Sequence, residues 1–171
     1  MSLKATVFFA IWTSFFCSVF NWLYMLCPVL QGHPWIMFIC LAVFFGLNST
    51  HKDVPHLIAS SACGVFWGQI DLWLMTFGVF GSALFGFMPI LVGTAITMVL
   101  HIFFFAKTPV RDVPIIFACV ALTFATKVGL LDGPGILGLF LSVLIGLVLC
   151  GICAVGQQIG MKKFPLPESN D

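Results

Sequence analysis

Long apolar runs alternate with short polar connectors along almost the whole of this chain. A helix needs about 20 apolar residues to cross the ~30 Å hydrocarbon layer of a membrane. The connectors contain turn-forming residues or a proline that can begin the next helix. The pattern therefore predicts an all-α, polytopic membrane protein with six transmembrane helices, over residues 5–27, 34–48, 55–77, 84–106, 113–128 and 134–158.

The boundary between the third and fourth runs decides the number of spans. If Gly78 to Gly86 form a loop, the chain has six spans, and if they stay helical one long span replaces two. With the loop, the chain divides into a first three-helix repeat (1–78), a second three-helix repeat (79–160) and a cytoplasmic tail (161–171).

The two halves of the chain match each other in their middle runs, which predicts an internal repeat. Both halves then continue with Asp-x-Pro, at Asp53 and at Asp132. Because three spans per half is an odd number, the halves would cross the membrane in opposite directions, as the inverted repeats of many transporters and channels do. At a constant offset, Ile36, Phe38, Cys40, Ala42 and Phe45 correspond to Ile115, Phe117, Cys119, Ala121 and Phe124.

Small residues recur at every fourth position in the third and sixth runs. This spacing places them on one helix face, where two helices can approach closely. The ladders either join the third and sixth spans within one chain or join subunits of a homodimer or trimer. In a further interpretation, the glycines leave room for a permeating solute. The ladder residues are Ser60, Gly64 and Gly68 in one run and Gly138, Ser142 and Gly146 in the other.

Polar residues inside the runs are few, and each costs free energy unless it faces a partner, the bundle interior or water. Asp71, close to Gln69 and one turn from Trp67, is the first candidate. A charge facing lipid at the helix centre costs ~2.5–3.5 kcal/mol on insertion scales. Asp71 either lines a pathway or anchors the helix at the interface, and Lys127 either pairs with it or extends to the headgroups.

Four more residues complete the set of pathway or binding candidates. His101 either takes part in proton transfer or stays neutral and hydrogen-bonded. Thr123 can form a hydrogen bond between helices. Phe45 and Phe124, at matching positions of the two halves, either narrow a pathway or face lipid.

Composition and charge limit the function classes further. The chain is 61% hydrophobic and 8% charged, whereas soluble domains are about half apolar and about a quarter charged. A net charge of +1 gives no reason to expect nucleic-acid binding. With six spans, all Lys and Arg residues except Lys127 share the side of both termini, which are therefore expected to be cytoplasmic.

The sequence contains no recognisable catalytic motif. The seven cysteines lie within the predicted spans, where they act as small apolar residues. Cys150 and Cys153 have CxxC spacing, but no second CxxC or histidine pair accompanies them. No phosphate-binding loop or hydrolase motif is present. We therefore expect no enzyme, no cofactor and no metal site.

Several apolar motifs carry a resemblance to a known family: Pro34-Trp35, Phe38, residues 42–46, Ser60, residues 64–68, and Val113-Pro114 through Phe124-Ala125. Over residues 30–160 the chain resembles the YcdZ-like family of small bacterial inner-membrane proteins, which has a domain of unknown function. The resemblance implies a multi-pass protein of the bacterial inner membrane and brings no catalytic residues.

Two functions are predicted from these observations. The first is a channel or facilitator for a small neutral or weakly polar solute, near the pseudo-two-fold axis between the second, third, fifth and sixth spans. Because buried charge is scarce, passive passage is favoured over an ion-driven pump. The alternative is a non-transporting accessory subunit in the lipid bilayer, whose glycine ladders pack against partners.

Overall fold

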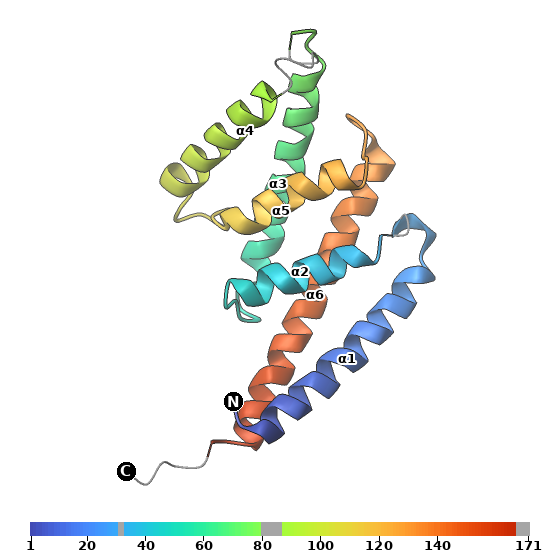
Figure 1. The fold of residues 1–171 in the computed structure, drawn as a ribbon, viewed down its shortest axis with the longest axis vertical. Coiled ribbons are helices and arrows are strands. Elements are labelled where there is room, and N and C mark those ends of the chain that lie inside the picture. The colour runs from blue at the N-terminus through green and yellow to red at the C-terminus, as the bar shows by residue number, and fades with distance from the viewer. Residues whose placement is uncertain (31–32, 80–86, 167–171) are drawn as a thin grey trace.

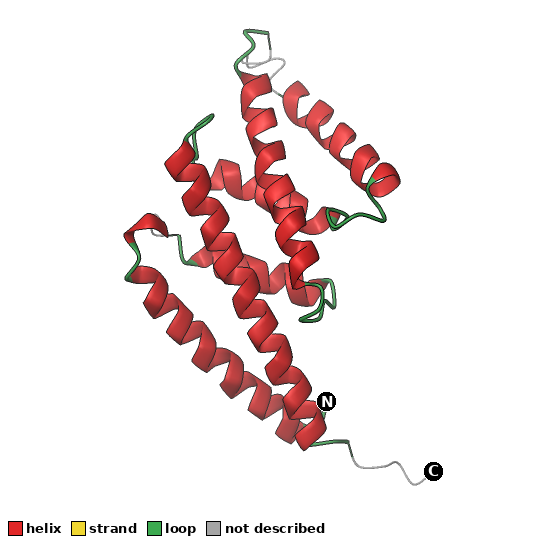
Figure 2. Cartoon of the chain, turned by 180° about the vertical axis from the view of Figure 1, so that it is seen from behind, coloured by secondary structure: helices red, strands yellow, loops and turns green. Residues whose placement is uncertain are grey.

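The described part of the chain contains six α-helices (Figure 1). This computed structural model describes residues 1–30, 33–79 and 87–166. The described residues contain no strand (Figure 2), so the predicted all-α class is confirmed. The helices are α1 (Leu3–Met25), α2 (Trp35–Gly46), α3 (Val54–Met75), α4 (Met88–Val99), α5 (Val113–Ala125) and α6 (Gly133–Lys163), with a 3₁₀ turn η1 (Pro28–Leu30) and a π-helical turn η2 (Leu100–Phe104).

Each predicted apolar run contains one helix, but the helices differ in length. Helices α1, α3 and α6 are long and apolar enough to cross a membrane. Helices α2 and α5 have 12 and 13 residues, which is about 18–20 Å at 1.5 Å per residue. Helix α4 together with η2 spans Met88–Phe104. The described residues thus contain three helices of full spanning length, which indicates a membrane protein.

The ends of the helices follow the turn chemistry of the sequence. A proline stands in the first turn of α3, α4, α5 and α6, where its missing N–H leaves no helical bond unmade. Just after α2 and α5, Asn48 and Lys127 adopt positive φ angles of 54° and 56°, which end a helix in the left-handed conformation. Helix α3 ends at Met75 and α4 begins at Met88. Of the Gly78 to Gly86 boundary, residues 80–86 lie outside the described residues.

The two long helices α3 and α6 form the centre of the fold, and a short helix packs against each of them. Helix α5 packs along α3, α2 packs along α6, and α2 and α5 also contact each other. In Figure 1 the two short helices lie side by side and cross the long ones. Helix α1 packs along α6, whereas α4 packs along α3.

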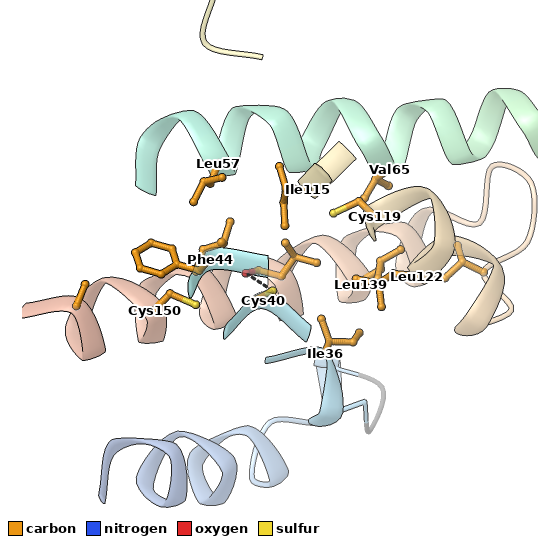
Figure 3. Packing of buried hydrophobic residues seen from close by; sticks show 14 residues of the cluster. Ile36, Cys40, Phe44, Leu57, Val65, Ile115, Cys119, Leu122, Leu139 and Cys150 are labelled. Atoms are coloured by element: carbon orange, nitrogen blue, oxygen red, sulfur yellow. Dashed lines mark hydrogen bonds between the residues drawn. The ribbon is translucent and has the colours of Figure 1, made fainter. Parts of the chain in front are cut away.

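Apolar side chains fill the region where α2, α3, α5 and α6 meet. Figure 3 shows Cys40 of α2, Cys119 of α5 and Cys150 of α6 within this cluster, together with Phe44 and Leu57. All five side chains are almost completely buried. The region between α2, α3, α5 and α6, where the sequence predicted a solute pathway, is therefore occupied by packed apolar groups.

Two glycines allow the short helices to approach the long ones. A Cβ atom on Gly64 would lie 2.7 Å from Cys119 Cβ, and one on Gly146 would lie 2.8 Å from Cys40 Sγ. Distances below 3.0 Å essentially never occur for real Cβ atoms. The glycine ladders therefore form close helix contacts inside this chain, between α3 and α5 and between α6 and α2.

Candidate functional site

Polar and small side chains gather where α3 packs against α4 and η2, a region we call the α3–α4 seam. Each contributing helix supplies residues four positions apart, which places them on one face. Helix α3 contributes Cys63, Trp67 and Asp71, and the α4–η2 segment contributes Gly93, Thr97 and His101. Thus three predicted candidates, Asp71, Trp67 and His101, lie in one seam.

Asp71 is buried in the seam with an unmet hydrogen-bonding group. Its residue is 4% exposed, and its Oδ1 atom has no hydrogen-bond partner among the described residues. Gly93 lies directly against this oxygen, because a Cβ atom on Gly93 would overlap Oδ1. Leaving a buried acceptor unsatisfied costs about 1–3 kcal/mol. The seam therefore presents a carboxylate oxygen that can accept a hydrogen bond.

Lys127 does not form an ion pair with Asp71. Its side chain is exposed after the end of α5, and the ion pair found in the described parts of the chain is between Arg111 and Asp112, at 3.9 Å. Asp71 thus forms no ion pair with Lys127 or with another cation among those residues.

His101 is held by hydrogen bonds on both ring nitrogens. The indole Nε1 of Trp67 is 3.1 Å from His101 Nε2, and indole N–H groups only donate. His101 Nε2 therefore accepts, and Nδ1 donates to the carbonyl oxygen of Val110 at 2.6 Å. Cys63 Sγ also lies 3.5 Å from Nε2. The ring is accordingly the neutral Nδ1–H tautomer, and it ties η2 to α3 and to the chain before α5.

Gln69, two residues before Asp71, lies on another face of α3. Its Oε1 atom accepts a hydrogen bond from the backbone N–H of Leu131 at 3.0 Å. Leu131 belongs to the connection between α5 and α6 and has a positive φ of 56°. Gln69 is therefore separated from the seam and contacts the α5–α6 connection instead.

The remaining candidates lie in packing positions. Thr123 is fully buried, donates to the Cys119 carbonyl at 2.9 Å and fills the space beside Gly68 of α3. Phe45 is partly buried, with its ring centroid 5.8 Å from that of Phe9. Phe124 is also partly buried. None of these three candidates takes part in the hydrogen bonds described for the α3–α4 seam.

The serines of the two ladders anchor the connections that lead into the short helices. Ser60 Oγ lies 3.2 Å from the backbone N–H of Asp112, which precedes α5. Ser142 Oγ lies 2.8 Å from the Tyr24 hydroxyl, which in turn accepts from the backbone N–H of His33 at 3.1 Å before α2. Gly138 is also buried and accepts from Ser142 at 2.7 Å. The ladder residues are thus buried within one chain.

Gly93 belongs to the seam but is not among the candidates predicted from the sequence. It lies in a predicted apolar span, where a glycine has many roles. The signal that could have found it is the four-residue spacing from Gly93 through Thr97 to His101, which marks one face of that helix.

Comparisons with known proteins identify a family but no characterised relative. Neither the curated proteins nor the solved structures yield a match to this sequence. A family profile described as "Protein of unknown function (DUF1097)" matches residues 2–157. Because this match covers most of the 171 residues, the chain belongs to the DUF1097 family of proteins of unknown function.

Proposed function

We propose that this protein is a channel or facilitator that lets a small neutral or weakly polar solute cross the bacterial inner membrane, with Asp71 as the group that meets the solute. The observation that carries the proposal is the buried Asp71 Oδ1, which lacks a hydrogen-bond partner among the described residues. Ionisable residues inside membrane helices are costly, and those that are retained usually serve a substrate, ion or partner.

A six-span, inverted-repeat arrangement is part of the proposal, and the helix contacts support it. If α1, α2 and α3 correspond to α4, α5 and α6, the packing of α3 on α5 corresponds to that of α6 on α2. The packing of α4 on α3 likewise corresponds to that of α1 on α6. The contacts between α3 and α6 and between α2 and α5 would then lie on the pseudo-two-fold axis that relates the two halves.

Contacts of single residues support the same correspondence. Gly64 packs against Cys119 of α5, and Gly146 packs against Cys40 of α2; Cys40 and Cys119 occupy matching positions of the repeat. Asn48 and Lys127, which end α2 and α5 with positive φ angles, stand at the same offset. The short helices would cross the hydrocarbon layer with local thinning of the bilayer.

Both termini are proposed to be cytoplasmic. In Figure 1 the termini and the α2–α3 and α4–α5 connections lie toward the left and lower left, whereas the α1–α2 and α5–α6 connections lie toward the right. Every Lys and Arg except Lys127 belongs to the first group of segments. Cytoplasmic segments are enriched in these cations, so this distribution supports the assignment.

At the seam, Asp71 would accept a hydrogen bond from an N–H or O–H group of the solute. His101 and Trp67 satisfy each other and would hold α3 and α4 at a fixed separation while the solute passes. With no further carboxylate among the seam residues, the arrangement favours passive movement down a gradient over coupling to an ion.

The test is solute flux into liposomes containing the purified protein, followed by stopped-flow light scattering with small amides, weak acids and sugars. Wild-type protein should accelerate the entry of at least one of these solutes over protein-free liposomes. Asp71→Leu should lower that rate by at least the two- to tenfold equivalent of one hydrogen bond, without lowering the melting temperature. Gly93→Ala should have a similar effect, because its Cβ atom would displace the carboxylate.

Gly46→Ala is the matched control, since no atom lies within 4 Å of a Cβ at that position. Flux should be unchanged in this variant. If wild-type and Asp71→Leu liposomes are both as slow as protein-free ones for all three solute classes, the proposal fails, and the accessory-subunit function takes its place.

A further inference from the structure

A groove on the outside of the helix bundle separates α3 from the start of α6. Its volume is about 480 Å³, within the range of small-molecule sites. Its rim includes the exposed side chains of Phe66 and Leu137, so the groove is open to the surroundings of the bundle. The apolar lining comes from Ala62, Val65 and Phe66 of α3 and from Ile136, Leu137 and Phe140 of α6.

Gln69 is the polar side chain of this groove. It is 9% exposed, and its Oε1 atom accepts from the backbone N–H of Leu131. Because a backbone N–H can only donate, the amide oxygen must face Leu131 and the amide nitrogen must point elsewhere. Gln69 Nε2 has no hydrogen-bond partner among the described residues. Gln69 therefore brings a buried amide donor without a partner to the lining of an otherwise apolar groove.

The position of Gln69 indicates which acceptor would meet these donors. Helices α3 and α6 are two of the helices that can cross a membrane, and Gln69 is bonded to the connection that precedes α6. That connection lies at the membrane–water interface if α6 spans the bilayer. The ester carbonyls of glycerophospholipids lie at the same level, next to the hydrocarbon layer.

We propose that the groove binds a diacyl glycerophospholipid, one ester carbonyl of which accepts a hydrogen bond from Gln69 Nε2. One acyl chain then lies along the apolar lining. From Gln69 back to Ala62, and from Gly133 on to Phe140, the groove extends seven residues along each helix, or ~10 Å toward the membrane centre. This site rests on the membrane placement of α3 and α6, and not on solute passage at Asp71.

The experiment uses the full chain in liposomes with two photoreactive phospholipids that carry a diazirine on one chain. One has ester-linked chains, and the other has ether-linked chains without the carbonyl. Mass spectrometry measures the labelling of the groove residues of α3 and α6. The diacyl lipid should label them roughly two- to tenfold more than the diether lipid, the factor expected for one hydrogen bond.

Two variants test the contribution of the Gln69 hydrogen bond and that of the groove separately. Gln69→Glu keeps the oxygen that faces Leu131 and removes the amide donors, so diacyl labelling should fall to the diether level. Gln157→Glu, at the far end of α6, is the matched control and should change nothing. Ala62→Phe replaces an exposed residue with a ring that fills the groove, and should lower labelling by both lipids.

Equal labelling by the two lipids in the wild-type protein would overturn the proposal. So would unchanged labelling in Ala62→Phe, or a cross-linked dimer joined through the groove, which would assign this surface to a second copy of the chain. Asp71→Leu should leave lipid labelling as it is. The proposed lipid site and the proposed solute pathway are therefore tested by different measurements, lipid labelling and solute flux.

Discussion

Gly64→Ala tests the close packing of α3 on α5, on which the arrangement of the short helices depends. The new Cβ atom would lie 2.7 Å from Cys119 Cβ and 2.9 Å from Ile116 Cα, and it would overlap the Ile116 carbonyl oxygen. Two of these three atoms belong to the backbone of α5, which cannot rotate away as a side chain can. The helices must therefore move apart to admit one methyl group.

The expected loss of stability is about 2 kcal/mol. Overpacking a well-packed interior costs about 1–3 kcal/mol, and a clash with backbone atoms belongs at the upper end. Alanine in place of glycine recovers up to about 1 kcal/mol through its helix propensity. On the scale of soluble proteins of this size, where 1 kcal/mol shifts the melting temperature by about 2–4 °C, Gly64→Ala should melt about 4–8 °C lower.

Melting of the purified protein in detergent, followed by tryptophan fluorescence, measures this difference. Gly46→Ala is the control, because a Cβ atom there meets nothing within 4 Å; its melting temperature should stay the same or rise. A melting temperature of Gly64→Ala at or above that of the wild type would mean that α3 and α5 are not in close contact at this residue.

Three further predictions concern the connections and the seam. Leu131→Gly should raise the melting temperature, because Leu131 has a positive φ of 56° that glycine adopts without strain, whereas Leu130→Gly should lower it. Hydrogen bonds from the Thr50 backbone N–H and hydroxyl lower the pKa of Asp53. The ionised Asp53 carboxylate therefore stabilises the folded state above the unfolded pKa of about 3.9. This stabilisation is lost as the pH falls further and the carboxylate is protonated. Asp53→Asn should thus melt below wild type at pH 7, and the difference should shrink in acid. His101→Ala should shift the tryptophan emission and destabilise the fold, because two buried polar groups lose their partner.

The order and approximate positions of the described helices followed from the sequence, because they depend on local chemistry. Apolar runs placed six helices, and prolines marked the first turns of α3, α4, α5 and α6. Helix α6 continues to Lys163, five residues past its predicted end at residue 158. The apolar run ends there, but Gln157 and Gln158 do not oppose helix formation, so hydropathy underestimated the helix.

The pairing of helix faces was harder to predict. In a membrane protein both the lipid-facing and the buried positions are apolar, so Phe38, which is exposed, and Cys40, which is fully buried, look alike in sequence. Polar residues have the same ambiguity. Asp71 and Gln69 are neighbours in sequence, yet two positions on a helix differ by about 200°, which puts one in the seam and the other in the groove.

Water access to position 71 is the most direct test of the proposed solute pathway. In a background without native cysteines, Asp71→Cys would be reacted with a membrane-impermeant maleimide in liposomes, beside Phe66→Cys on the lipid-facing surface of the same helix and Asn48→Cys in a connection. If solute passes through the seam, Asp71→Cys should react at a rate approaching that of Asn48→Cys. Protection of Asp71→Cys to the level of Phe66→Cys would contradict a pathway through the α3–α4 seam.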